Sequence, residues 1–172
     1  MDKAARHLDL ETWLARALDE SEPDAAIGSL LAATRTIEDG QQSEITDALV
    51  QIAGRELNGR QRVDLLRTLG VTFARHGRPN DEHRNHLVAT LKPHFPSESR
   101  ALNHELCRML VYLGSEDVVE QAVSLMARSV TQEDLLAYGM MLRVADQGWT
   151  DVSRRSYFSL LNKLETGAAT AD

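Results

Sequence analysis

His83 and His86 are three residues apart in a polar run that also contains Asp81 and Glu82. On a helix this spacing places both imidazoles on one face, where a neighbouring carboxylate could add a third metal ligand. A metal ion normally needs three or four ligands whose orientation is supported by further hydrogen bonds, and the rest of this run is solvated and polar. We therefore predict no metal site here, and we expect His76 at the surface or at a helix end.

The single cysteine, Cys107, follows His104 and Glu105 and could be imagined as the nucleophile of a Cys-His-acid triad. However, a histidine on the same helix is held by the backbone in a poor position to act as its base. No lysine or paired histidine is placed to lower the thiol pKa. We interpret Cys107 as a half-buried, unreactive thiol and His104 as a surface or capping residue. The sequence thus predicts no catalytic residue.

Methionine and tryptophan side chains are expected to fill the core. Met109, Met126, Met140 and Met141 have core-like spacing, and haem ligation by methionine has no support. Trp13 is expected in the core, and Trp149 is expected to anchor the last helix. We predict no cofactor-binding residue and no cofactor.

Four polar residues could either link adjacent helices through their side chains (bracing) or lie exposed to solvent. They are Asn103, Glu105, Arg108 and Arg155. In the bracing hypothesis Glu105 pairs with Arg108 or Arg155 across the helix stack. The alternative, in which all four are solvated, explains the pattern equally well.

A basic stretch stands out in the first half of the chain, comprising Arg55, Arg60, Arg62, Arg67, Arg75 and Arg78. It raises the alternative of a nucleic-acid enzyme of the helical-repeat DNA glycosylase type, which needs a basic concave face with an aromatic residue and a carboxylate inside it. The formal net charge of −7 and the aromatic content of 5% oppose this alternative. We expect no nucleic-acid partner.

Apolar residues recur at helical spacing along the chain, and about nine helices are expected. The first covers 9–19, the second runs from Pro23 to near Gly40, and the third covers 43–57. The fourth is capped by Asn58 and ends at His76-Gly77, and Asn80 caps the fifth. Prolines disfavour a helix over 92–97. The sixth helix is expected to begin near 98, and the seventh is expected to be capped by Ser115. The eighth is expected to begin at a capping box of Thr131 and Asp134, and the ninth after Gly148-Trp149.

These helix starts recur so that a helix pair occupies about 33 to 36 residues, which is typical of helical repeats. Each narrow apolar stripe needs a neighbour, so pairs must stack and share a core. The expected fold is therefore all-α, with antiparallel helix pairs stacked as a HEAT-like α-solenoid. We expect one domain over 1–166, an internal boundary near 92–97 and a disordered tail over 167–172.

The stretch from Leu110 to Leu125, with Leu113-Gly114-Ser115-Glu116-Asp117 at its turn, resembles the HEAT-repeat pattern. In that pattern a helix ends in Leu-Gly, a short acidic turn follows, and the next helix opens with paired branched residues, here Val118-Val119. HEAT arrays are protein-interaction scaffolds, so the resemblance implies that role.

About Arg62 to Leu164 also resembles a helical domain of large planctomycete proteins that combine a β-propeller dehydrogenase-like region with a c-type cytochrome module. The similar segments are Leu65-Leu66-Arg67, Arg75-His76-Gly77-Arg78-Pro79, Phe95-Pro96, Leu102-Asn103-His104-Glu105-Leu106-Cys107-Arg108, Leu110-Val111-Tyr112-Leu113, Thr131-Gln132-Glu133-Asp134, Gly148-Trp149-Thr150 and Arg154-Arg155-Ser156-Tyr157-Phe158. The chain departs from these proteins in having no Cys-x-x-Cys-His motif, which excludes covalent haem within these residues.

The sequence therefore predicts a non-catalytic scaffold or protein-interaction domain, as a fragment of a larger redox protein that carries haem elsewhere. Besides the nucleic-acid enzyme, a cytoplasmic adaptor that binds a peptide between helices is an alternative. The expected partners are another protein or neighbouring domains of the same parent chain. No apolar run is long enough for a membrane segment, and the N-terminus has no signal-peptide core. We expect export if the redox-protein resemblance holds and a cytoplasmic location otherwise.

Overall fold

The computed structural model describes the backbone of residues 10–37 and 41–168 and the side chains of these residues as far as Asn162. Over this part the chain is helical and contains no strand. The helices are α1 (Leu10–Asp19), α2 (Pro23–Thr34), α3 (Gln42–Ala53), α4 (Gly59–His76), α5 (Asp81–Leu91), the 3-10 helix η1 (Lys92–His94), α6 (Arg100–Tyr112), α7 (Val118–Ala127), α8 (Gln132–Leu142) and α9 (Asp151–Ala168). The all-α prediction is confirmed, as is the expected number of α-helices over the described residues.

The chain divides into two compact units, Met1–Thr90 and Leu91–Asp172. The division lies next to the boundary expected near 92–97, where η1 interrupts the α-helical pattern.

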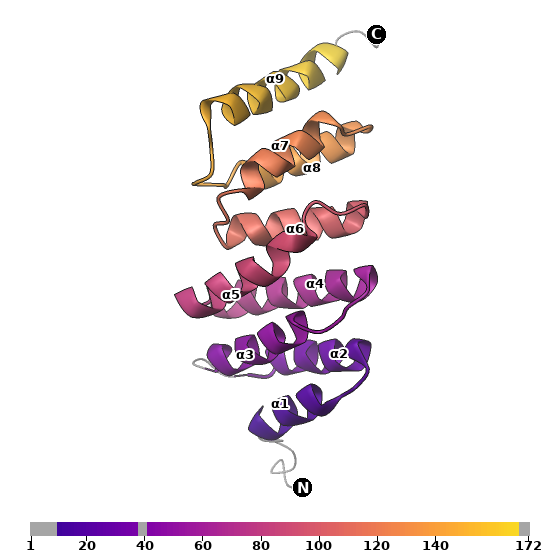
Figure 1. Cartoon of the computed structure of the whole chain (residues 1–172), viewed down its shortest axis with the longest axis vertical. Helices are drawn as coiled ribbons and strands as arrows, with labels where there is room; N and C mark the ends of the chain where they lie inside the picture. The colour runs from indigo at the N-terminus through magenta and orange to yellow at the C-terminus, as the bar shows by residue number, and fades with distance from the viewer. Residues whose placement is uncertain (1–9, 38–40, 169–172) are drawn as a thin grey trace, which may run out of the picture. The chain divides into compact units, whose positions relative to one another are not determined.

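In the first unit, the helices α1 to α4 pack against one another in chain order, and α1 also packs on α3 and α2 on α4. Figure 1 shows α2 between α1 and α4. The helices α2 and α4 run parallel, because Asp24 contacts Gln61 near the start of both helices and Thr34 contacts Thr72 near their ends. These contacts join residues 37 and 38 apart.

The second unit repeats this order of packing with α6, α7, α8 and α9. Arg100 at the start of α6 pairs with Asp134 at the start of α8, and His104 one turn later meets Tyr138. The helices α6 and α8 are therefore also parallel, and their paired residues are 34 apart. This spacing lies within the period of 33 to 36 predicted for a helix pair, and the first unit has a slightly longer one.

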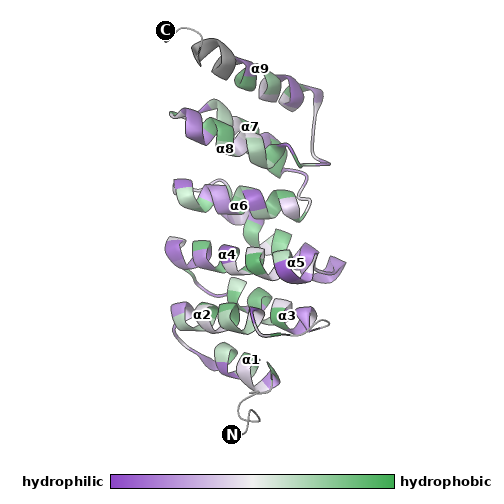
Figure 2. Cartoon of the chain, turned by 180° about the vertical axis from the view of Figure 1, so that it is seen from behind, coloured by the Kyte–Doolittle hydropathy of each residue, from purple (hydrophilic) through white to green (hydrophobic). Residues whose placement is uncertain are grey.

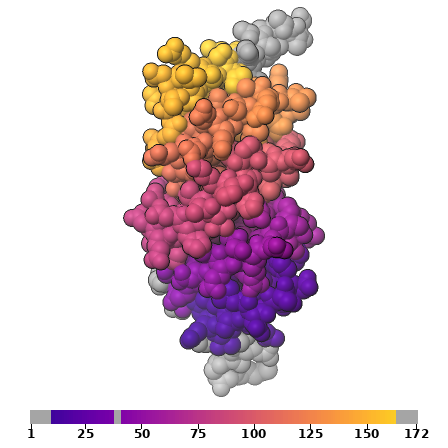
Figure 3. Space-filling model, in the orientation of Figure 1, coloured from indigo at the N-terminus to yellow at the C-terminus, as the bar shows by residue number. Residues whose placement is uncertain are grey.

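Leucine, alanine and valine dominate the core of both units, as the low aromatic content requires. In the first unit Leu30, Ile45, Leu49 and Leu66 are buried, and in the second unit Leu106, Leu110, Ala122 and Met126 are buried. Most helices carry both hydrophobic and hydrophilic residues (Figure 2), as expected of helices that bury one side. The space-filling view shows that side chains fill the space between successive helices within each unit (Figure 3).

Several predicted helix ends are confirmed by side-chain caps. The amide oxygen of Asn58 accepts from the Gln61 backbone N–H, and the Gln61 side chain accepts from the Asn58 N–H, which forms a reciprocal capping box. Asn80 accepts from the His83 N–H at the start of α5. Thr131 accepts from the Asp134 N–H, as predicted. The Asp134 carboxylate, expected to close that box, is held by Arg100 instead.

Other helix ends differ from the prediction. The helix α2 ends at Thr34 rather than near Gly40, and α3 ends at Ala53 rather than Leu57. The helix α7 begins after Asp117, because the buried Ser115 belongs to the turn that closes α6, where its N–H donates to the Leu110 carbonyl. The helix α9 extends to Ala168, so two residues of the expected tail are helical, and 169–172 lie outside the described residues.

The turn into α9 depends on a glycine. Gly148 has φ +80°, and a Cβ at this position would lie 2.1 Å from the Glu116 carbonyl oxygen. Only glycine accepts both the left-handed backbone and this close approach. The hydroxyls of Thr150 and Ser153 then cap the start of α9 reciprocally.

Among the described residues, no helix combines the length and the apolar character needed to span a membrane.

Candidate functional site

A shallow groove of about 340 Å³ lies between α2 and α4 in the first unit. Apolar side chains of Ile27, Leu31 and Val71 line it, together with Gly28 and the buried Thr68. The charged residues around it are Asp24, Arg35, Arg60, Asp64 and Arg67. The groove therefore joins an apolar strip to a rim with three guanidinium groups and two carboxylates.

The parallel packing of α2 and α4 places these groups together. At the N-terminal end the capping glutamine, Gln61, also donates from Nε2 to Asp24 Oδ2 at 2.8 Å, which ties the start of α4 to the start of α2. At the other end Thr34 Oγ1 and Thr72 Oγ1 are 3.1 Å apart, and His76 Nε2 lies 3.1 Å from the Thr34 carbonyl oxygen. These polar contacts at both ends, of which the Thr34–Thr72 contact is buried, fix the register in which the rim residues face one another.

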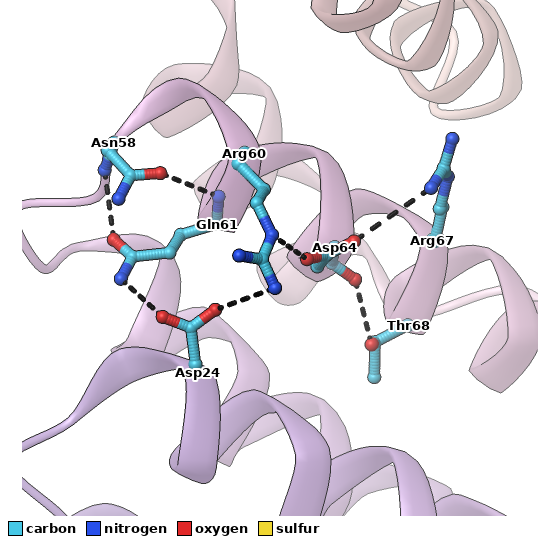
Figure 4. Close-up of polar contacts among 7 residues, drawn as sticks. All are labelled: Asp24, Asn58, Arg60, Gln61, Asp64, Arg67 and Thr68. Atoms are coloured by element: carbon cyan, nitrogen blue, oxygen red, sulfur yellow. Dashed lines mark hydrogen bonds and ion pairs between the residues drawn. The ribbon is translucent and has the colours of Figure 1, made fainter.

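Arg60 lies between the two carboxylates (Figure 4), with its guanidinium nitrogens 3.7 Å from Asp24 Oδ1 and 3.7 Å from Asp64 Oδ2. Arg67 Nη1 lies 3.9 Å from Asp64 Oδ1. These distances are long for ion pairs, and the side chains of Arg60 and Arg67 are 82% and 61% exposed. Such pairs contribute little to stability, so a ligand carboxylate can compete for the guanidinium groups.

Arg35 is the third cation of the rim. It is exposed at the end of α2, and it has no ion-pair partner among the described residues. With three arginines and two aspartates the groove has a net positive charge of one, although the whole chain has a formal charge of −7. The groove is thus a local exception to the acidic surface of the protein.

Gly28 keeps the groove open. A Cβ at Gly28 would have no heavy atom within 4 Å, so the position borders free space rather than a packed neighbour. Gly70, on α4, is open in the same way but does not line the groove. These two glycines therefore offer a matched pair for a binding test.

The predicted basic stretch does not form one surface. Arg62 is buried, where desolvation lowers its pKa, and its Nη2 donates to the Leu57 carbonyl. Arg55 donates to the backbone carbonyls of Leu18 and Glu20, which joins the end of α3 to the end of α1. Two of the six arginines thus serve the fold, and only Arg60 and Arg67 reach the groove.

The histidines considered for metal binding have different surroundings. His83 is buried rather than solvated, and its Nε2 lies 2.6 Å from Asp47 Oδ1 on α3, whereas His86 is exposed. Within the described part of the chain, no cluster of three or more metal-ligating side chains forms. The polar pattern around His83 contained no signal for its burial or for its contact with Asp47, 36 positions away.

Cys107 is fully buried rather than half-buried, because it faces inward next to Leu106 on α6. Burial raises the pKa of this thiol to about 12, and the nearby Arg108 opposes the rise only in part. A group with such a pKa is almost entirely protonated at neutral pH, so this thiol has very little thiolate available for nucleophilic attack.

His104 joins the contact between α6 and α8 instead of lying free at the surface. Its ring packs edge-on against Tyr138 at 5.1 Å, and Nε2 is 3.0 Å from Asp134 Oδ1, in an orientation that does not form a hydrogen bond. Burial acts to raise the pKa of Asp134, but the hydrogen bond and charge of Arg100 and the charge of His104 lower it on balance. Desolvation also raises the pKa of Tyr138 to about 12.

The expected core residues are placed in part as predicted. Met109 and Met126 are buried, but Met140 is 57% exposed and Met141 is half-buried. Trp149 packs edge-on against Tyr157 at 5.2 Å, in agreement with its expected anchoring of α9. Trp13 is half-buried rather than part of the core.

The bracing residues also have mixed outcomes. Glu105 pairs with Arg108 Nη1 at 2.7 Å, but this contact lies within α6 and not across the stack. Asn103 is buried and binds both the N–H and the carbonyl of Ser97, which fixes the turn before α6. Arg155 is exposed on α9.

Comparison of the chain with known protein families, with curated proteins and with solved structures finds no match.

Proposed function

We propose that this chain is a non-catalytic protein-interaction domain whose groove between α2 and α4 holds an acidic amphipathic segment of a partner protein. The observation that carries the proposal is the combination in one groove of an apolar strip (Ile27, Leu31 and Val71) with exposed arginines. Apolar side chains of the segment would lie on the strip, and its carboxylates would meet Arg35 and Arg67. Grooves between helices commonly hold peptides in this manner.

A protein segment fits this groove better than a nucleic acid does. Proteins that bind single strands combine a positively charged groove with aromatic side chains on which bases stack, and this groove has no aromatic lining. Binding to duplex DNA rests on many cationic contacts to phosphates, whereas the groove carries a net charge of one. The apolar strip would remain unused by a phosphate backbone.

The order of helix packing supports a HEAT-like repeat array as the wider architecture. Among α1 to α4 and among α6 to α9, successive helices pack on one another and also on the next helix but one, and the parallel contacts recur at 34 to 38 residues. Each unit thus contains two stacked helix pairs, and in the first unit α5 follows them. We propose that these pairs are HEAT-like repeats, and a solved structure with comparable helix-pair geometry would test this assignment.

The proposal that the domain belongs to a larger redox protein rests on the resemblance of residues 62 to 164 to the planctomycete proteins. The reading frame that contains this chain tests it directly. A Cys-x-x-Cys-His motif in the same reading frame would support the redox-protein proposal, and a frame without that motif would contradict it.

The binding proposal is tested with labelled helical peptides by fluorescence anisotropy. The peptides share their apolar positions and carry glutamate, glutamine or lysine at the flanking positions. We expect the glutamate peptide to bind most tightly, and we expect Arg35→Glu to weaken its binding about tenfold, which corresponds to about 1.4 kcal/mol. Equal affinity for the glutamate and lysine peptides would contradict the acidic partner.

Two glycine variants separate groove blocking from general effects on the fold. Gly28→Leu projects a side chain into the groove, and Gly70→Leu adds the same side chain to α4 outside it. Both remove a helix-interior glycine, so neither should destabilise the protein. We expect Gly28→Leu to abolish peptide binding and Gly70→Leu to leave it unchanged. Salt-sensitive binding of DNA that Gly28→Leu does not affect would favour the nucleic-acid alternative.

A further inference from the structure

The outer side of α8 carries a stripe of large apolar side chains that water reaches. Leu136, Met140 and Val144 are 49%, 57% and 66% exposed. Leu136 and Met140 are one helical turn apart on α8. Val144 lies in the non-helical turn that follows the end of α8. The opposite side of the helix is covered, since Tyr138 and Leu142 are buried.

This stripe differs from isolated apolar residues on a surface. A single exposed leucine or valine is common, but Leu136 and Met140 at i and i+4, continued by Val144 in the turn after α8, form a narrow apolar stripe of the kind that packs on another helix. One charged residue lies near each end of the stripe. Glu133 is exposed in the first turn, and Arg143 is exposed just after the last residue of α8.

The order of charge and apolar residues makes the stripe complementary to itself. When two copies of α8 cross antiparallel with Met140 near the two-fold axis, Leu136 of one copy faces Val144 of the other. Glu133 of one copy then lies about one turn from Arg143 of the other, within reach of two long side chains. A parallel arrangement would bring like charges together at both ends. Two-fold pairing of this type requires such self-complementarity.

We propose that the outer stripe of α8 is the interface of a weak, reversible homodimer in which two copies pair antiparallel. The occupant is a second copy of this chain, because its acidic and basic ends match only in that arrangement. Three apolar side chains with two ion pairs form a small contact, so the dimer dissociates readily on dilution. The interface is independent of the groove between α2 and α4.

Sedimentation velocity of the full chain over a range of protein concentrations tests the dimer. We expect the weight-average sedimentation coefficient to rise with concentration for the wild type and to stay at the monomer value for Met140→Lys. Val152→Lys is the matched control, because Val152 is 74% exposed but lies on α9. Circular dichroism confirms that each variant is folded, and Leu136→Glu provides a second disruption of the stripe.

Charge reversal tests the antiparallel register. Glu133→Arg and Arg143→Glu should each weaken dimerisation about tenfold, because each creates two like-charge contacts across the two-fold axis. The double variant should restore it to near the wild-type level. A wild type that stays monomeric at all concentrations would overturn the proposal. A dimer insensitive to Met140→Lys, or a double variant no better than the singles, would overturn it as well.

Discussion

Individual side chains with reactive chemistry serve the core of this protein. The thiol of Cys107 is fully buried on α6, and the buried imidazole of His83 is held by Asp47 on α3. Arg62 is buried beside the capping box of α4, with its Nη2 on the Leu57 carbonyl. In each case the surrounding packing decides whether a reactive group is available to a ligand.

At this scale the accessibility of Cys107 gives a direct prediction. The thiolate is the reacting species, and burial raises the thiol pKa to about 12. We expect native protein at pH 8 to react with a thiol reagent at least about a thousandfold more slowly than protein unfolded in guanidinium. The native reaction is slower because the folded protein holds less thiolate at Cys107 and because the reagent cannot reach the buried sulfur. Absorbance of the released chromophore measures both rates. Rapid labelling of the native protein would contradict the burial of Cys107.

At the scale of helices, parallel neighbours are joined by polar contacts near their ends. In the first unit Gln61 both caps α4 and binds Asp24 of α2. In the second unit the N–H of Asp134 is capped by Thr131, and its carboxylate binds Arg100 of α6. These residues combine a local role in the helix with a contact to its neighbour, and they set the register of the stack.

The Asp134 contact predicts a dependence of stability on pH. Because the folded pKa of Asp134 is lowered, its contribution is present above the unfolded value near 3.8 and is lost as pH falls through the folded value. We expect Asp134→Asn to lower the free energy of unfolding by about 1 kcal/mol at pH 7, a modest effect because Arg100 is largely exposed. The difference from wild type should shrink below about pH 4.

Urea unfolding of both proteins between pH 3 and pH 8 measures this difference. Glu133→Gln is the control, because it removes an adjacent exposed carboxylate while leaving Asp134 in place. A difference for Asp134→Asn that stays constant with pH would show that the charge of Asp134 does not stabilise the α6–α8 contact.

At the scale of the whole molecule the two units each have a core of their own. Leu49 lies in the core of the first and Leu106 in that of the second, and both are fully buried. The groove belongs to the first unit, and the α8 stripe belongs to the second. Peptide binding and self-association should therefore respond to different sets of substitutions.

Hydrogen exchange tests the separate cores. Leu49→Ala and Leu106→Ala should each destabilise the protein by about 2–5 kcal/mol, since each leaves a cavity in a packed core. We expect the loss of amide protection to concentrate in α1–α4 for Leu49→Ala and in α6–α9 for Leu106→Ala. Mass spectrometry of proteolytic fragments resolves the two regions. Equal loss in both units for either variant would show that they unfold as one.

Local signals predicted much of the secondary structure. The caps at Asn58, Asn80 and Thr131 were visible because a cap and the N–H that it binds are only three residues apart. The spacing of apolar residues predicted an all-α chain for a related reason, since helical periodicity is a property of neighbouring turns. The predicted period of 33 to 36 residues for a helix pair agrees with the contact 34 residues apart in the second unit, whereas the contacts of the first unit are 37 and 38 residues apart.

Contacts between distant residues decided the rest. Periodicity shows which residues share one side of a helix, but not which sides a neighbour covers, so Met140 was expected in the core and is exposed. The groove depends on the register of α2 against α4, in which residues 37 and 38 apart meet. The contact of His83 with Asp47 likewise joins residues far apart in the sequence. Side-chain packing over such separations is a property of the folded chain, so burial, the groove and the exposed stripe emerged only from its tertiary structure.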